Sequence, residues 1–182
     1  MTVQIHRCAV AMIAVAALSP TPPALASGWT ALGPPGGDVM ALVADRSAPG
    51  TLYAGVWGGG VWKSIDGGAN WAVASTAMRG WSVHALAIDP ARPRTLYAGT
   101  FDNGVWKTVD GGATWTKVMG AARQASILRI VVDPTNPQNV FAATDTGPND
   151  GVQRSADGGA TWTAGVVPGD EADRAGGGGG DG

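Results

Sequence analysis

The carboxylates are the residues of this sequence best suited to acid–base chemistry. The 182-residue chain has 14 acidic residues, and all but Glu171 are aspartates. Hydrolysis of a glycosidic bond needs two carboxyl groups that flank that bond. Asp38 and Asp102 are the candidate pair, and Asp145 and Asp150 lie in a further loop that offers a second carboxyl group. Among the residue types present, such a pair is the most direct route to catalysis.

Aromatic and arginine side chains offer a second kind of chemistry, the recognition of a ligand. Aromatic rings stack on flat ligand surfaces, and carboxylate and guanidinium groups hydrogen-bond to hydroxyls. The candidates lie in stretches that we predict to be loops: Trp57, Arg79, Trp81, Phe101, Asp102 and Arg123. Single exposed aromatic and arginine residues are also ordinary on protein surfaces, so the sequence leaves both interpretations open.

Other kinds of site find no support in the sequence. No Ser-His-Asp pattern or metal-ligand cluster is recognisable, and the glycine runs are not followed by the Lys-Ser/Thr of a phosphate-binding loop. His84 corresponds to Met40 and Leu128 in the repeats described below, which predicts a packed histidine. We therefore expect no cofactor and no metal. The net charge of −2, without a basic block, argues against nucleic acid as a partner.

The start of the chain has the pattern of an export signal. A short segment ending in Arg7 precedes an apolar run, Cys8 to Leu18, and Ala24-Leu25-Ala26 is a small-x-small cleavage site. The apolar run is too short to span a bilayer, which takes about 20 residues. We expect residues 1–26 to be removed and the protein to be secreted or periplasmic, without stable membrane insertion. Because Cys8 is the only cysteine, the mature chain then has no disulfide.

The candidate residues sit on a repeat. Asp45, Asp89 and Asp133 are 44 residues apart, and each closes an apolar run. A segment like Leu-Tyr-Ala-Gly, a segment like Gly-Val-Trp-Lys and a turn that ends in Trp follow each Asp. We predict four strands per copy, in the second copy at about 82–88, 95–100, 104–109 and 114–118. A period of about 40–50 residues with four strands per copy is typical of a β-propeller blade.

Each copy contains an acidic turn with the pattern Ser/Thr-x-Asp-x-Gly-x-Asn/Thr-Trp. Its recurring residues are Ser64, Asp66, Gly68 and Trp71, then Thr108, Asp110, Gly112 and Trp115, and finally Ser155, Asp157, Gly159 and Trp162. This pattern resembles the Asp-box (BNR) repeat, and the resemblance covers residues 29 to about 167. It implies a BNR-like propeller, as found in bacterial sialidases, xyloglucanases, sortilin-type receptors and photosystem II assembly factor-like proteins. Because that group includes enzymes and binding proteins, the resemblance implies a fold and leaves the function open.

We expect the acidic turns to be structural. In a four-stranded blade they join the third and fourth strands, on the face opposite the loops that carry Trp57, Phe101 and Asp102. The Asp then accepts N–H groups of its own turn, Gly supplies unusual backbone angles, and Trp packs beneath. One carboxylate per turn is too few for calcium, which takes about six to eight oxygen ligands.

The repeats predict an all-β partial β-propeller of three four-stranded antiparallel blades and one extra N-terminal outer strand. Trp29-Thr30-Ala31 matches Trp162-Thr163-Ala164, which predicts the extra strand. The expected segments are the signal at 1–26, a lone outer strand and linker at 27–37, blades at 38–75, 76–119 and 120–168, and a disordered Gly-rich tail at 169–182. Propellers usually have four to eight blades. Three blades therefore indicate a fragment of a longer propeller, or a homo-oligomer in which several chains complete one ring.

Two functions remain as hypotheses. The first is an exported, non-catalytic propeller module that binds a protein or a glycan. The second is a fragment or relative of a glycoside hydrolase of the xyloglucanase or sialidase kind, with Asp38 and Asp102 as its acid and base. The first predicts that the loss of both carboxylates leaves binding unchanged, and the second that either Asp→Asn exchange abolishes activity on a β-glucan.

Overall fold

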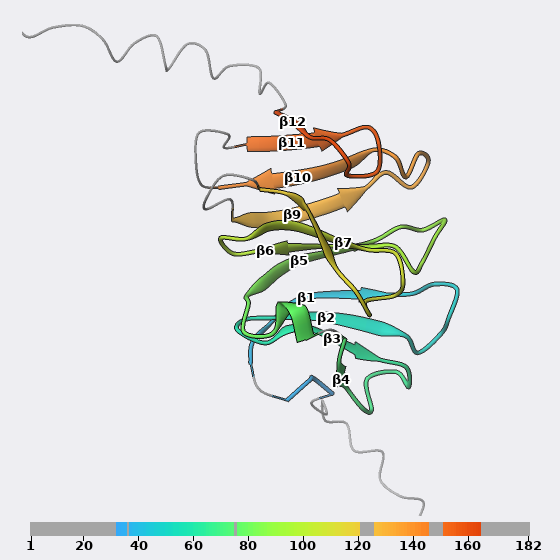
Figure 1. The fold of residues 1–182 in the computed structure, drawn as a ribbon. Helices are drawn as coiled ribbons and strands as arrows, with labels where there is room; N and C mark the ends of the chain where they lie inside the picture. The colour runs from blue at the N-terminus through green and yellow to red at the C-terminus, as the bar shows by residue number, and fades with distance from the viewer. Residues whose placement is uncertain (1–31, 36, 75, 121–125, 146–150, 165–182) are drawn as a thin grey trace, which may run out of the picture. The chain divides into compact units, whose positions relative to one another are not determined.

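Three four-stranded antiparallel sheets form the described part of the chain (Figure 1). The computed structural model describes residues 32–35, 37–74, 76–120, 126–145 and 151–164. Blade 1 contains β1 (Val39–Ala44), β2 (Leu52–Val56), β3 (Gly60–Ser64) and β4 (Ala72–Val73). Blade 2 contains the short 3-10 helix η1 (Thr76–Met78), β5 (Val83–Ile88), β6 (Leu96–Thr100), β7 (Gly104–Thr108) and β8 (Thr116–Met119). Blade 3 contains β9 (Ile127–Val132), β10 (Val140–Thr144), β11 (Gly151–Ser155) and β12 (Thr163–Ala164). The predicted all-β class with three such blades is confirmed.

Each blade is a meander in which every strand pairs with its neighbour in the chain. The connection from the first to the second strand is closed by the Asp of the 44-residue period, whose carboxylate accepts the N–H two residues further on. These bonds run from Ser47 to Asp45 at 2.8 Å, from Ala91 to Asp89 at 2.9 Å and from Thr135 to Asp133 at 2.8 Å. The repeating aspartates therefore mark a repeating turn.

The first strand of each blade has a β-bulge. In blades 1 and 2 the register of pairing shifts between Val39 and Ala41 and between Val83 and Ala85, and β10 shows a matching shift opposite the start of β9. The residues left out of the pairing are Met40, His84 and Leu128. A bulge turns such a side chain out of the normal alternation of the strand. His84 therefore points in a direction that a period-two pattern does not predict.

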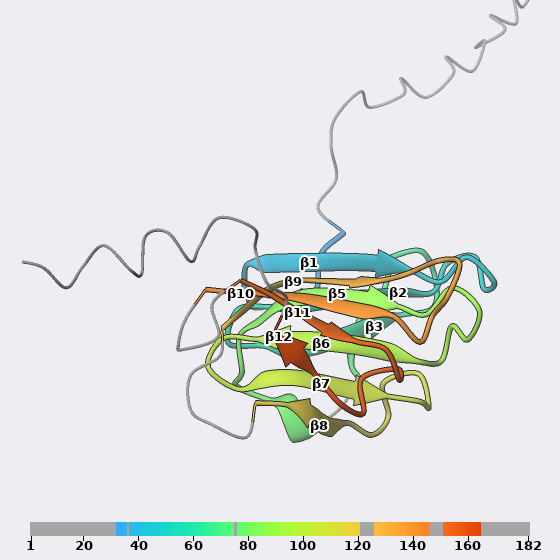
Figure 2. The ribbon, with the colours of Figure 1, turned by 90° about the horizontal axis from the view of Figure 1, so that it is seen from above.

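Neighbouring blades pack face to face. Among the first strands, β5 contacts both β1 and β9, and the three lie side by side in Figures 1 and 2. One apolar cluster joins blade 1 to blade 2 around Tyr53, Val61 and Leu96, and a second joins blade 2 to blade 3 around Tyr97, Val105 and Val140. These interfaces hold the loops of adjacent blades in fixed positions next to one another.

The same polar contact recurs at both interfaces, and we call it the tyrosine latch. The Tyr53 hydroxyl and the Lys63 ammonium donate to the Gly111 carbonyl at 3.2 and 3.3 Å. The Tyr97 hydroxyl and the Lys107 ammonium donate to the Gly158 carbonyl at 2.8 and 2.7 Å. In each case two donors of one blade hold the acidic turn of the next blade.

Several predictions fall outside the described residues. Trp29–Ala31 of the predicted extra strand, the signal segment and the Gly-rich tail are among them, and so are Arg123 and Asp150. Leu32 and Gly33 are described and belong to no strand. Within the described residues, no helix is long and apolar enough to cross a membrane.

Candidate functional site

The loops between the second and third strands of each blade lie beside the segments that lead into the first strands. The N–H of Trp57 donates to the Asp38 carbonyl at 2.9 Å, and that of Phe101 donates to the Ser82 carbonyl at 2.9 Å. In blade 3, the N–H of Asp145 donates to the Ser126 carbonyl at 3.3 Å. The repeat thus brings Trp57, Phe101 and Asp145 to equivalent places on one face, which we call the loop face.

Three rings from two blades meet on the loop face, and we call Trp57, His84 and Phe101 the aromatic platform. The ring centroids of Trp57 and Phe101 lie 5.6 Å apart, and both rings contact the His84 imidazole at 5.0 and 5.4 Å. Trp57 stacks on His84 with an interplanar angle of 28°. Trp57 is 47% exposed and Phe101 is 41% exposed, so two large apolar rings face solvent together.

His84 supports this platform from below. It belongs to β5 and is only partly exposed, and its Nε2 is buried and has no hydrogen-bond partner within the described structure. The sequence predicted a packed histidine here and did not predict that it would hold the two loop aromatics. No sequence signal indicated this, because the bulge that turns the side chain of His84 towards the loops breaks the alternation from which strand faces are predicted.

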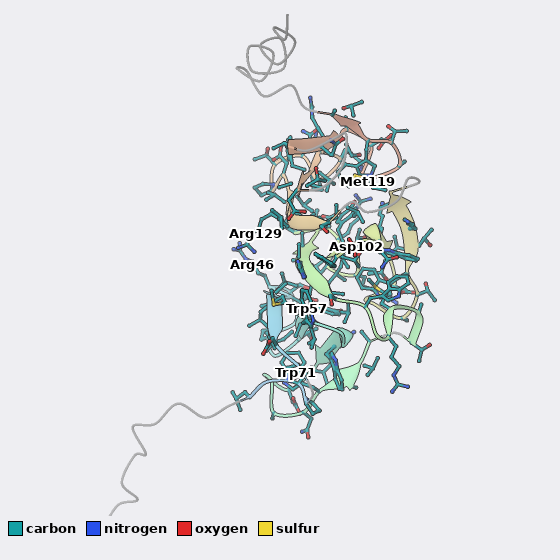
Figure 3. All side chains as sticks on the ribbon, turned by 90° about the vertical axis from the view of Figure 1, so that its left-hand side faces the viewer. Arg46, Trp57, Trp71, Asp102, Met119 and Arg129 are labelled. Atoms are coloured by element: carbon teal, nitrogen blue, oxygen red, sulfur yellow. The ribbon has the colours of Figure 1, made fainter. Side chains whose placement is uncertain are left out.

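Asp102 follows the platform residue Phe101 and has a backbone φ of +67°, a rare value for a residue other than glycine. Gly58 has the equivalent place in blade 1 and a φ of +65°. Asp is one of the few residues that adopts this conformation without great cost. The Asp102 carboxylate accepts a hydrogen bond from the Ser126 hydroxyl at 3.4 Å, and the residue is otherwise exposed. Figure 3 labels Trp57 and Asp102, which come from neighbouring blades.

The other candidate residues are placed differently. Trp81 is partly buried and packs against Trp106 at 4.8 Å between the centroids, so it is part of the blade 1–blade 2 interface rather than of the platform. Arg79 is exposed next to η1. Asp38 and Asp145 are exposed on the loop face, where Asp38 adjoins Trp57 through the backbone bond given above. The described structure thus groups Trp57, Phe101 and Asp102, and adds His84 to them.

The acidic turns lie on the opposite face from the platform. Their backbones bond to the connection between the first and second strands of the same blade, for example Gly111 N–H to the Arg94 carbonyl at 2.8 Å. In blade 2 the Asp110 carboxylate accepts the Thr114 hydroxyl at 2.5 Å, the Thr114 N–H at 2.9 Å and the Thr108 hydroxyl at 2.7 Å. These bonds, those from Thr114 foremost, hold the pKa of Asp110 well below its usual range.

Blades 1 and 3 repeat this arrangement around Asp66 and Asp157, with Asn70 and Thr161 as the chief donors. The pKa of each of these carboxyls is likewise lowered, first of all by the side chain of that donor. The carboxylates are committed to their own turns, which is what a structural role requires. Within the described residues, no group of three or more His, Cys, Asp or Glu side chains comes together as a metal site.

Comparison with known proteins places these sheets in a common architecture. No protein-family model matches the chain, and no curated protein matches it. The fold is similar to the GH74 enzyme of Niastella koreensis, with 26% identity, a TM-score of 0.59, and coverage of 71% of this chain and 22% of that one. It is also similar to YCF48 bound to D1 peptide, with 15% identity, a TM-score of 0.54, and coverage of 70% and 40%.

A third similar structure is Chaetomium thermophilum Sqt1 bound to the N-terminus of ribosomal protein L10. Its identity is 15%, its TM-score is 0.50, and the coverage is 73% of this chain and 36% of that one. The chain thus spans well under half the length of each of these proteins. All of them are β-propellers, so the three sheets are blades of a partial propeller. The neighbours include both enzymes and binding proteins, and the fold alone does not choose between these roles.

Proposed function

We propose that this chain is part of an exported β-propeller binding module and that its aromatic platform stacks on a carbohydrate. The observation that carries this proposal is the pair of half-exposed rings, Trp57 and Phe101, held 5.6 Å apart by adjacent blades. Aromatic side chains give large contact areas at a low cost in conformational entropy, because they have only two rotatable bonds. Because the rigid blades hold both rings in place, ligand binding would cost little further conformational entropy.

The surroundings of the platform suit a sugar ring. Pyranose rings combine a face of C–H groups with hydroxyls at the edge, and they need an aromatic surface together with hydrogen-bond acceptors. Asp102 supplies a carboxylate immediately beside Phe101, and its one described bond, from Ser126, is long at 3.4 Å. This leaves acceptor capacity for ligand hydroxyls. The similarity to a GH74 enzyme at 26% identity supports a carbohydrate over other ligand classes.

The proposal is tested by titration with a soluble β-1,4-glucan oligosaccharide such as cellohexaose, followed by tryptophan fluorescence or calorimetry. We expect saturable binding that weakens at least about tenfold in Trp57→Ala and in Phe101→Ala, since central aromatic contacts of this kind contribute about 2 kcal/mol or more. Val109→Ala is the matched control, because Val109 is an exposed apolar residue in an acidic turn.

Two results would count against a carbohydrate ligand. Equal affinity of the Val109 and Trp57 variants would show that the platform is not the contact surface. Lack of binding to cellohexaose together with binding of a peptide at the same two aromatic residues would assign the platform to a protein partner. YCF48 and Sqt1 were each solved with a polypeptide, which makes that outcome a well-defined alternative.

A glycoside hydrolase remains the second candidate, because the GH74 neighbour is an enzyme and both Asp38 and Asp102 lie on the loop face. If the chain, or the longer protein that contains it, cleaves a β-glucan, Asp38→Asn and Asp102→Asn should each abolish product formation while binding to the platform persists. Under the binding proposal no variant forms product, and Asp38→Asn leaves binding unchanged. Asp102→Asn weakens binding by the loss of an acceptor charge, which replaces the expectation from the sequence that neither carboxylate contributes to binding.

A further inference from the structure

A pocket of about 330 Å³ lies on the face of blade 1 that points away from blade 2. Leu52 and Ala54 of β2 form its floor, and Gly67, Gly68 and Trp71 of the acidic turn form one wall. Leu32 closes it on the outer side, where its carbonyl accepts the indole N–H of Trp71. The pocket is apolar apart from backbone groups, and Figure 3 marks its position by Trp71.

Blades 2 and 3 contain the same pocket, and in both it is filled by a tyrosine. Tyr53 lies on Gly112, with its ring carbon 3.6 Å from the place that a Cβ on Gly112 would take, and its hydroxyl bonds to the Gly111 carbonyl. Tyr97 lies on Gly159 in the same way, and its hydroxyl bonds to the Gly158 carbonyl. Both tyrosines are almost fully buried, at 2% and 0% exposed.

The residue types that line the blade 1 pocket correspond to those of the filled copies, but the indole of its Trp bonds differently: Trp71 donates to the Leu32 carbonyl, whereas Trp115 and Trp162 donate to the glycine carbonyls of their own turns. Leu52 and Ala54 correspond to Leu96 and Ala98 in blade 2, and Trp71 corresponds to Trp115. On the outer side of the blade 2 pocket, Ala74 lies 3.3 Å from the Cβ position of Gly112.

Leu32 closes the blade 1 pocket in the same manner. It lies 3.6 Å from the Cβ position of Gly68, and it follows Trp29 by three residues as Ala74 follows Trp71. Leu32 thus has the place that the outer strand of a preceding blade would take. Blade 1 therefore has a complete tyrosine pocket, including the Gly67 carbonyl as acceptor, without a tyrosine.

We propose that this pocket receives the side chain of a tyrosine from a partner polypeptide, with the hydroxyl donating to the Gly67 carbonyl. Tyr53 and Tyr97, the two tyrosines of this sequence, are buried in the latches, so neither of them fills the pocket. A second copy of the chain would bring Phe141, which has the corresponding position in blade 3 and lacks the hydroxyl that bonds to the turn carbonyl in the other two pockets. The occupant that would make all the contacts seen in those pockets is a Leu-Tyr-Ala-Gly-like strand, and the peptide pair below compares it directly with phenylalanine.

The experiment uses two synthetic peptides, Thr-Leu-Tyr-Ala-Gly-Val, which copies residues 51–56, and the same peptide with Phe in place of Tyr. Binding to the full chain is followed by NMR through the Trp71 indole and the Gly67 and Gly68 amides. We expect saturable shifts at these groups, and an affinity for the tyrosine peptide about fivefold higher than for the phenylalanine peptide, the usual effect of one hydrogen bond. The Trp115 and Trp162 indoles belong to filled pockets and should not move.

A pair of variants connects the shifts to the pocket. Leu42 lines it and is 61% exposed, so Leu42→Glu should weaken peptide binding without disturbing the core. Val109→Glu places the same charge on an equally exposed residue in the acidic turn of blade 2, outside this pocket, and should leave binding unchanged.

Several results would overturn the proposal. These are equal affinity for the two peptides, equal shifts at all three indoles, no shift at millimolar peptide, or equal loss of binding in both variants. Binding of p-cresol at the Trp71 indole without binding of the tyrosine peptide would show a pocket for free phenols instead of a polypeptide.

Discussion

Removal of the Tyr97 hydroxyl tests how the blades are held together. Tyr97→Phe keeps the buried ring and deletes the 2.8 Å bond to the Gly158 carbonyl, but the Lys107 ammonium still donates to that carbonyl at 2.7 Å. No acceptor is left without a partner, so we expect a loss of only about 0.5–1.5 kcal/mol in the free energy of unfolding. For a domain of this size, about 1 kcal/mol corresponds to a fall of about 2–4 °C in Tm.

The double variant Tyr97→Phe/Lys107→Met should lose more than the sum of the two single variants. With both donors gone, the buried Gly158 carbonyl loses both latch hydrogen bonds, and a buried acceptor left unsatisfied costs about 1–3 kcal/mol. We therefore expect a non-additivity of about 1 kcal/mol, measured by urea unfolding with tryptophan fluorescence as the signal.

Two further variants serve as controls for the latch. Tyr53→Phe should cost less than Tyr97→Phe, because the Tyr53 hydroxyl lies 3.2 Å from its acceptor and that bond is longer. Phe141→Tyr adds a hydroxyl on the face of blade 3 that no described blade covers, and it should have little effect. Strict additivity of the double variant, or a larger loss for Tyr53→Phe, would refute the idea that two donors share one carbonyl.

Three further predictions concern stability. Because the pKa of Asp110 is lowered in the folded chain, this carboxylate contributes stability above about pH 4, and the contribution is lost as the pH falls through the pKa of the folded state. Asp110→Asn should therefore flatten the decline of Tm below about pH 4. An unchanged decline would contradict this. Burial raises the pKa of Tyr97 to about 12, so this hydroxyl ionises at a lower pH in the unfolded chain than in the folded one. The free energy of unfolding should therefore fall between about pH 10 and 12. Urea unfolding should show a less steep fall in Tyr97→Phe than in the parent chain. Gly99→Ala should destabilise by about 1–3 kcal/mol, because its Cβ would lie 2.5 Å from Ile127 Cγ2 across the interface. Ala143 has the same place in β10, on the face of blade 3 that no described blade covers, and Ala143→Gly should cost only the backbone entropy of a glycine in a strand, about 0.5–1 kcal/mol.

Much of the fold was predictable because the chain repeats itself. The 44-residue spacing of Asp45, Asp89 and Asp133 and the alternation within each copy indicated four strands per blade, and the strands lie within about two residues of the predicted ones in blade 2. The η1 turn at Thr76–Met78 was not predicted, because a single helical turn has no periodic pattern. The bulges were not predicted either, since they break the alternation on which strand prediction depends.

The candidate site, like the fold, was predictable from the sequence only in part. Trp57, Phe101 and Asp102 could be selected as loop residues from the sequence, because turn signals place them between strands. Their grouping with His84 depends on the contact of Trp57 with His84 across two blades, and the separation of Trp81 from them depends on its contact with Trp106 within blade 2. Both contacts join residues more than 20 positions apart, and no local pattern encodes them.

The sequence by itself determined the repeat, the strand order and the hydrogen-bonded acidic turns, because all of these depend on residues close together in the chain. Only the tertiary structure decided which side chains fill the spaces between blades. It placed the hydroxyls of Tyr53 and Tyr97 on the glycine carbonyls of the next blade, and it left the matching pocket of blade 1 without a tyrosine. The reason is physical: interblade packing depends on the distance and direction between two sheets, and these follow from the contacts of whole faces and not from any one segment.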